Sequence, residues 1–220
     1  MKKLDGNVCD SCGKLTYNNS DLCDECLEHS KGKVDNFNLV HSIIPNYGVI
    51  FIQVISRNKD GGTGEVIKSY YVHQSTLFDY KDEIIKLCKV FNARAYIQLN
   101  PCSNKKVQWH MVHNLLNYLE SGCTKITGIL SEACGTSYDR LFYLVDVDDY
   151  TKTDLIQHLI SQCTDAEQIL IPTVSGWHIV TKPFNVNKFY QLQEIEHLDR
   201  CEVHKQAMTL LYCDLSSNSQ

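Results

Sequence analysis

The chain has 220 residues, of which 43% are hydrophobic and 21% charged, and it contains 11 glycines and 4 prolines. These proportions exclude collagen-like, low-complexity and largely disordered classes of protein. The formal net charge of −5 supplies no global positive field, so any contact with nucleic acid requires a local basic surface.

The N-terminus and the hydropathy of the chain predict a cytoplasmic protein with no membrane partner. No run approaches 18 apolar residues, and residues 1–6 lack the apolar stretch of a secretory signal. The 11 cysteines are an odd number, which argues against an extracellular disulfide framework. Most of them are scattered among apolar neighbours and are interpreted as reduced, buried side chains.

The first predicted element along the chain is a small metal-binding module at residues 1–33. It carries Cys9-x-x-Cys12 and, after ten intervening residues, Cys23-x-x-Cys26, with almost no aliphatic residues that would form a core. Two such pairs present four thiolates to a tetrahedral zinc ion. The alternative, four unrelated buried cysteines, requires apolar neighbours that this segment lacks. We therefore expect a structural zinc site, without which the module does not fold.

Residues 34–220 are predicted to form one α+β domain, a mixed sheet with flanking helices. Its first half contains β-branched and apolar runs broken by turn-forming residues, followed by helical periodicities. The expected elements are a β-hairpin of strands 47–55 and 66–72, a helix at 76–90, a strand at 93–99 and a helix at 105–120. This last helix is expected to end at Ser121-Gly122, because glycine stops helices.

The second half of the domain begins with an apolar strand at 141–149 whose end is acidic. Thr153 is suited to cap a helix that runs to about Cys163. Strands at 169–172 and 176–181, a short helix at 185–193 and a final strand at 209–212 complete the expected order. The alternation of strands and helices, with no internal repeat, favours a single sheet.

Asp146 and Asp148 form the first candidate site. They are two residues apart at the acidic strand end, so both carboxylates leave the same face of the strand. Adjacent carboxylates repel unless a cation lies between them, which suits Mg²⁺ or Mn²⁺. The alternative is helix capping, to which Asp149 would add.

A second candidate site lies at residues 172–184. There a Ser175-Gly176 turn leads into a strand that carries His178, and Lys182 follows. These residues offer a hydroxyl, backbone N–H groups, an imidazole and an ammonium group to a polyphosphate. The alternative is that His178 is a core histidine beside Trp177.

The order of these two segments resembles that of the archaeo-eukaryotic primase superfamily, which includes primase-polymerases. Residues 144–148, Leu-Val-Asp-Val-Asp, resemble its motif I, and Ser175-Gly176-Trp177-His178 resembles its motif II. The resemblance covers about residues 90–215, with the motifs at 141–215. In that family the motif I acids bind two divalent cations, and the motif II histidine contacts the phosphates of the incoming nucleotide.

The resemblance implies a primase-polymerase-like core and a DNA primase or polymerase activity, that is, template-directed nucleotidyl transfer with two metal ions. Mg²⁺ or Mn²⁺ would be the catalytic metals. Single-stranded DNA template and nucleoside triphosphates would be the partners, together with a helicase or another replication protein. Asp146, Asp148 and a third acid would hold the metals, and Ser175, Gly176, His178 and Lys182 would hold the nucleotide.

The third acid of the family, motif III, has three candidates here: Asp199, Glu202 and Asp214. Asp199 and Glu202 are favoured over Asp214, because the resemblance continues through residues 203–205 into the final strand. Glu202 would depart from the family's usual aspartate.

Three cations are candidate contacts for nucleic acid. Arg94 lies on the predicted strand at 93–99, and Lys105 and Lys106 precede a helix. Each would add a salt-dependent contact with a backbone phosphate. The alternative for both lysines is a solvated helix start.

Two other functions remain open. One is a primase-like fold without catalysis that serves as a nucleic-acid-binding or replication accessory protein. The other is a metal-dependent nuclease, although no Glu-x-Lys or paired His-x-Asp arrangement accompanies the acids. P-loop and Rossmann nucleotide sites are excluded, because their glycine motifs are absent. His110 and His113 are interpreted as solvent or core histidines rather than as a metal site.

Overall fold

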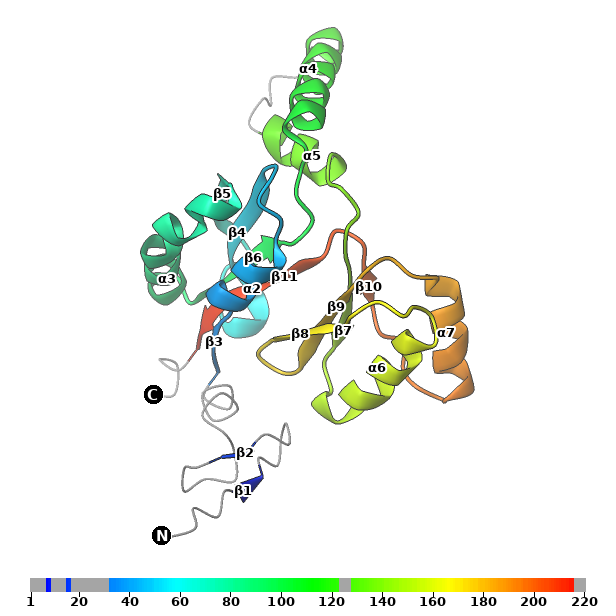
Figure 1. Ribbon diagram of the computed structural model, residues 1–220. Coiled ribbons are helices and arrows are strands. Elements are labelled where there is room, and N and C mark those ends of the chain that lie inside the picture. The colour runs from blue at the N-terminus through cyan, green and yellow to red at the C-terminus, as the bar shows by residue number, and fades with distance from the viewer. Residues whose placement is uncertain (1–6, 9–14, 17–31, 123–127, 216–220) are drawn as a thin grey trace.

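The computed structural model describes residues 7–8, 15–16, 32–122 and 128–215. The chain is α+β, as predicted, but the prediction of one mixed sheet is wrong. The described strands form a five-stranded and a four-stranded sheet, in addition to a short pair near the N-terminus, and every strand pairing is antiparallel. Figure 1 shows the two larger sheets side by side, with helices on their outer sides.

The five-stranded sheet has the order β3-β11-β6-β4-β5. Its strands are β3 (Lys33–Asp35), β4 (Ile50–Ser56), β5 (Val66–Val72), β6 (Ala93–Gln98) and β11 (Met208–Asp214). Helices α2 (Phe37–Ile43) and α3 (Lys81–Val90) and the 3₁₀ segment η2 (Gln74–Tyr80) pack with this sheet around the main core. The alternation along β4 buries Ile50, Ile52 and Val54 on one face. Its opposite face is therefore left to form one wall of a cleft.

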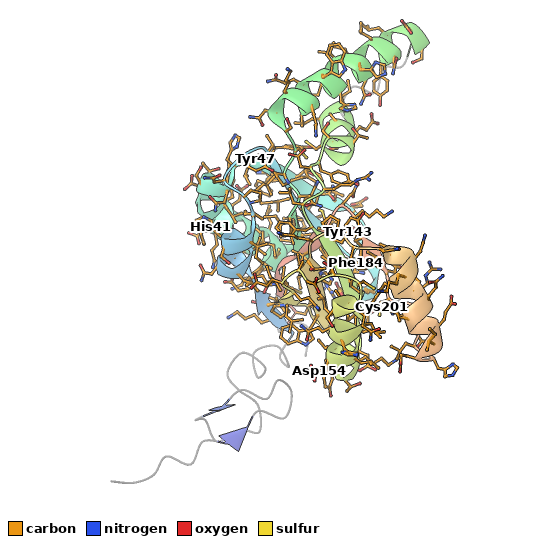
Figure 2. All side chains as sticks on the ribbon, turned by 45° about the vertical axis from the view of Figure 1, so that its right-hand side comes forward. His41, Tyr47, Tyr143, Asp154, Phe184 and Cys201 are labelled. Atoms are coloured by element: carbon orange, nitrogen blue, oxygen red, sulfur yellow. The ribbon has the colours of Figure 1, made fainter. Side chains whose placement is uncertain are left out.

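The four-stranded sheet has the order β10-β7-β9-β8. Its strands are β7 (Tyr143–Val147), β8 (Ile169–Pro172), β9 (Trp177–Thr181) and β10 (Val203–His204). Helices α6 (Thr153–Ser161) and α7 (Val186–Ile195) share a core with one face of this sheet. Tyr143 and Phe184, which Figure 2 labels, meet edge to face with ring centroids 5.8 Å apart. Packing of this face directs the alternate residues of β7 and β9 towards the other sheet.

Asn100, which follows β6, ties the two sheets together. It is fully buried, and its amide group donates hydrogen bonds to the carbonyl oxygens of Phe142 (2.9 Å) and Lys205 (3.0 Å). Its Oδ1 accepts hydrogen bonds from the backbone N–H groups of Leu141 (3.1 Å) and Phe142 (2.9 Å). One side chain thus satisfies four backbone groups at the entry to β7 and at the connection between β10 and β11.

Asn36 makes a second link between the sheets. Its buried amide group donates to the carbonyl oxygen of Pro172 in β8 (2.9 Å) and to that of Leu210 in β11 (2.8 Å). Because β8 and β11 belong to different sheets, these two hydrogen bonds connect the sheets at the end opposite to Asn100.

Helices α4 (Asn104–Ser121) and α5 (Ile129–Thr136) pack against each other and project from the rest of the molecule in both views (Figures 1 and 2). The predicted end of α4 is confirmed, because Gly122 adopts the left-handed conformation with φ 66°. Val107 of α4 is buried, whereas four other apolar residues of this helix are exposed: Val112, Leu115, Leu116 and Leu119.

The remaining elements refine the predicted boundaries. The helix predicted at 76–90 is divided into η2 and α3, and two short 3₁₀ segments, η1 (Asn58–Asp60) and η4 (Tyr150–Lys152), follow β4 and β7. Strands β1 (Asn7–Val8) and β2 (Leu15–Thr16) pair with each other. The four cysteines of the predicted zinc site, Cys9, Cys12, Cys23 and Cys26, lie outside the described residues. None of the described helices combines the length and the hydropathy that a membrane span requires.

Candidate active site

A cleft of about 950 Å³ lies between the two sheets and is lined by residues from both. The wall from the four-stranded sheet and its loops is acidic, and the wall from the five-stranded sheet carries basic residues. The acidic wall includes Asp146, Asp148, Asp149, Asp199 and Glu202, and the opposite wall includes Arg57, Lys59, Arg94 and Tyr96. Lys152 and Arg200 also line the cleft on the side of the four-stranded sheet, so this wall carries more acids than bases without being uniformly acidic.

Three of the predicted site residues lie in a row across neighbouring strands. Asp146 on β7 is directly opposite His178 on β9. On the other side of β7, Val203 of β10 pairs with Val145, and the backbone N–H of Asp146 donates to the carbonyl of Glu202 at 3.0 Å. Directly opposed residues of antiparallel strands share a face. Glu202, Asp146 and His178 therefore all belong to the face that lines the cleft.

The imidazole of His178 is held from two directions. Its Nε2 lies 3.4 Å from Oδ1 of Asp146, and its Nδ1 lies 2.8 Å from the hydroxyl of Thr209. Nε2 faces the carboxylate and donates its N–H towards it, and Nδ1 forms a hydrogen bond with the hydroxyl. Thr209 lies on β11, and the ring therefore bridges the two sheets. His178 is buried, as the alternative of a core histidine requires, but it also lines the cleft.

The environment of Asp146 favours its ionised form. The hydrogen bond from His178 lowers the pKa of Asp146 below its ordinary value of 3.8, against the opposing effect of burial, and the charges of His178, His204 and Lys59 act in the same direction. The carboxylate is therefore available as an anionic ligand throughout the neutral pH range.

Removal of the imidazole is expected to raise the pKa of Asp146. In His178→Leu the carboxylate loses its hydrogen-bond donor, and its ¹³C-detected NMR titration should shift to higher pH. Because the folded-state pKa is depressed, this interaction stabilises the wild type above pH 3.8 and is lost as the pH falls through the folded-state pKa. The variant should therefore lose less stability over that acidic interval.

Asp149 provides an internal control in the same titration. Its pKa is also lowered, but by hydrogen bonds from Thr151, so it should not change in His178→Leu. An unchanged titration of Asp146 in the variant would show that the pair with His178 does not form in solution.

Gly176 allows the second candidate segment to approach the first. A Cβ atom at this position would collide with the carbonyl oxygen of Val147 and would lie 2.9 Å from the carbonyl carbon of Asp148. Only glycine fits this close approach of backbone to backbone. The neighbouring hydroxyl of Ser175 donates to Oδ1 of Asp148 at 3.5 Å. The Ser-Gly turn is thus in direct contact with the acidic strand end.

The three candidates for the third acid lie in different places. Glu202 is next to Asp146, and its exposed carboxylate lies 3.3 Å from Nε2 of His204. Asp199 is fully exposed at the rim of the cleft, 3.6 Å from Nζ of Lys152. Asp214 does not line the cleft and lies 3.8 Å from Nζ of Lys89. The geometry favours Glu202 as the partner of the Asp146 and Asp148 pair.

Three carboxylates of the acidic wall suit a hard divalent cation. Mg²⁺ and Mn²⁺ prefer carboxylate oxygens, and Asp146, Asp148 and Glu202 offer three carboxylates on one wall. Within the described ranges, no three His, Cys, Asp or Glu side chains are grouped closely enough to hold a metal ion. The side chains of Asp148 and Glu202 are exposed.

Of the four cations predicted to contact nucleotide or nucleic acid, one lines the cleft and three do not. Arg94 lines the cleft but is buried, and its guanidinium forms a bidentate pair with Asp60 at 2.7 and 2.6 Å. A phosphate contact by Arg94 would have to replace this ion pair. Lys182, Lys105 and Lys106 do not line the cleft, and Lys106 lies 2.7 Å from Asp139 beside α4. Their predicted contacts with nucleotide or nucleic acid stay predictions.

Apart from Arg94, sequence reasoning missed the residues of the opposite wall. Arg57 donates to the hydroxyl of Tyr96 at 2.7 Å, and Lys59 lies nearby in η1. Gln53 and Ile55 alternate with the buried residues of β4 and lie on its opposite face, and Arg57 follows at the same interval one residue past the end of the strand. That alternation was the available signal. No sequence signal pointed to Thr209, because its role depends on a contact between two sheets.

Comparisons of the chain with protein-family models, curated proteins and solved structures give no match. The residues of the cleft and the two short motifs are therefore the features that bear on function. Both motifs lie on its acidic wall.

Proposed function

We propose that the chain is a nucleotidyltransferase of the primase-polymerase type, which adds nucleotides to a strand paired with a single-stranded DNA template. The observation that carries the proposal is the row of Glu202, Asp146 and His178 on the acidic wall, with Arg57 and Lys59 opposite. Such a cleft matches the charge distribution of a metal-bound triphosphate.

Asp146, Asp148 and Glu202 are the residues that would hold the catalytic Mg²⁺ or Mn²⁺ ions, with Asp199 at the rim. Two such ions activate a 3′-hydroxyl and stabilise the departing pyrophosphate. The chain supplies their ligands and the shape of the cleft, and nucleotidyl transfer requires positioning and charge neutralisation more than covalent chemistry.

His178 is the residue that would contact the triphosphate. Its distance of 3.4 Å to Asp146 exceeds the usual range of an N–H···O hydrogen bond, so this contact is easily exchanged. When Asp146 acts as a metal ligand, Nε2–H becomes available to a phosphate oxygen while Thr209 still holds Nδ1. The ring then needs no reorientation. Ser175 and the backbone at Gly176 lie next to Asp148 and complete this part of the site.

Arg57 and Lys59 would neutralise the phosphates from the opposite wall. Both lie on or after the end of β4, in the segment that turns towards η1. Arginine suits phosphate recognition because its planar fork of N–H donors matches phosphate oxygens. The nucleotide would therefore be held between a wall that binds the metals and a wall that binds the charge.

A primer-extension assay with Mn²⁺ or Mg²⁺, nucleoside triphosphates and a labelled primer on a single-stranded template tests the proposal. Lengthened primers are the expected result. Shortened strands would assign the cleft to a nuclease, and nucleotide binding without extension would assign the chain to the inactive accessory class.

We also propose that residues 1–33 bind one structural zinc ion through Cys9, Cys12, Cys23 and Cys26. The support is the spacing of the two Cys-x-x-Cys pairs in a segment that is poor in core-forming residues. The paired strands β1 and β2 flank the first of these cysteine pairs in the sequence.

One zinc ion per purified chain is the expected stoichiometry by elemental analysis, and Cys23→Ser should remove it. Cys163→Ser is the matched control, since Cys163 is half-buried and remote from residues 1–33 in the sequence, and it should retain the metal. Chelation should leave the melting transition of the main domain in place. A wild-type chain that is purified without zinc would contradict this proposal.

A further inference from the structure

Helix α4 uses one of its faces to pack against α5. Val107 and Met111 belong to a small core with Ala133 and Cys134 of α5. One and two turns further along the same face, Asn114 and Tyr118 hydrogen-bond to Glu132 of α5. Spacings of three and four residues place these side chains on one side of the helix. This side of α4 therefore faces α5.

A second apolar face of α4 is covered by no described part of the chain. It consists of Trp109, Val112, Leu116 and Leu119, whose exposed fractions are 72%, 52%, 53% and 69%. With 3.6 residues per turn these four side chains form a continuous stripe on the side of α4 that points away from α5. We call them the α4 stripe. An exposed apolar surface of this kind marks an interaction site rather than a random scatter of side chains.

We propose that the α4 stripe binds the α4 stripe of a second copy of this chain, with the two helices antiparallel. The four residues follow one another at intervals of three, four and three. This order is the same in both directions, so a two-fold axis beside residue 114 places Trp109 against Leu119 and Val112 against Leu116 of the second copy. Intervals of three and four are those of helix pairs that pack knobs into holes. A two-fold axis requires such a self-complementary surface.

The charges at the two ends of α4 favour the same arrangement. Lys105 lies in the first turn and Glu120 in the last, and both are exposed. In an antiparallel pair, the lysine end of each helix lies beside the glutamate end of the other, about one helical turn away. Opposite charges that flank an apolar seam set the orientation of helix pairs. A parallel pair would place like charges together.

The length and position of α4 allow two copies to meet through this helix without blocking the cleft. The helix has 18 residues, which corresponds to about 27 Å, and it projects away from both large sheets (Figure 1). None of the stripe residues lines the cleft. Two copies that are joined through α4 would therefore keep both clefts open.

Sedimentation equilibrium of the full chain over a range of concentrations tests the proposal. The expected result is a concentration-dependent shift from the mass of one chain to twice that mass. Leu116→Glu should return the protein to a monomer and leave its circular dichroism and melting temperature unchanged, because the side chain is exposed in the single copy. Asn117→Glu is the matched control, since it adds the same charge to an exposed position off the stripe, and it should still dimerise.

A charge exchange tests the antiparallel orientation separately. Lys105→Glu alone should weaken dimerisation, and the double variant Lys105→Glu, Glu120→Lys should restore it. A wild type that remains monomeric at every concentration would overturn the proposal, as would a dimer that survives Leu116→Glu. A monomer whose affinity for single-stranded DNA falls in Leu116→Glu would assign the stripe to nucleic acid instead. None of these readouts depends on nucleotidyl transfer.

Discussion

Replacement of Asp146 with asparagine is expected to abolish primer extension while the protein stays folded. Asparagine keeps an oxygen that can accept the hydrogen bond from Nε2 of His178, so the ring should keep its position between β9 and β11. It lacks the negative charge that a divalent cation requires. The loss of one essential electrostatic contact to the reacting groups lowers turnover by about 10³-fold, and we expect a loss of at least this size.

The stability of Asp146→Asn should remain within about 1 kcal/mol of wild type, because a partly exposed ion pair contributes little and removal of the charge relieves repulsion with neighbouring carboxylates. Asp154→Asn is the matched control. Asp154 is an exposed acid on α6 that does not line the cleft (Figure 2), and its variant should extend primers normally. Extension by Asp146→Asn would remove the metal role, and a large fall in its melting temperature would assign the acid a structural role.

The largest loss of stability is expected for Asn100→Ala. The substitution removes four hydrogen bonds and leaves the carbonyl groups of Phe142 and Lys205 and the N–H of Phe142 without that partner. The N–H of Leu141 keeps a second acceptor, the carbonyl oxygen of Asp139 at 3.0 Å. Each buried polar group that loses its hydrogen bond costs about 1–3 kcal/mol, so the loss of three such bonds should lower the free energy of unfolding by about 3 kcal/mol or more. The fall should also be larger than that for Asn36→Ala, since the Asn36 amide serves only two carbonyl groups.

Urea unfolding, followed by tryptophan fluorescence and by circular dichroism, measures these differences. Asn117→Ala makes the same chemical change at an exposed position of α4 and should alter the free energy of unfolding by less than about 0.5 kcal/mol. A loss below about 1 kcal/mol in Asn100→Ala would mean that water replaces the four hydrogen bonds, and that Asn100 does not join the two sheets.

Elements with strong local patterns were predicted from the sequence with nearly correct bounds. The strand expected at 66–72 is β5, its hairpin partner is β4, and the helix expected at 105–120 is α4. What failed was pairing over long distances. The sequence pattern of β11 does not show that it lies between β3 and β6, and β10 is only two residues long. The division into two sheets depends on such contacts, which periodicity does not encode.

In the candidate site, too, features of a single strand were predictable from the sequence, whereas contacts between distant segments were not. Asp146 and Asp148 were expected on one face from the pleat of a single strand, and both line the cleft, although β7 ends at Val147, one residue before Asp148. The contact between His178 and Thr209 joins β9 to β11 and has no local signature. Arg94 illustrates the opposite error. A basic residue on a strand suggests a surface contact, but Asp60 of η1, which is distant in the sequence, pairs with Arg94 in a buried position.

A crystal structure of the protein with Mn²⁺ and a non-hydrolysable nucleoside triphosphate would show whether this cleft holds the metal and the nucleotide. We expect anomalous scattering from Mn²⁺ at the carboxylates of Asp146 and Asp148, with the triphosphate between His178 on one wall and Arg57 and Lys59 on the other. A nucleotide bound outside this cleft, or Mn²⁺ held away from Asp146, would contradict this expectation.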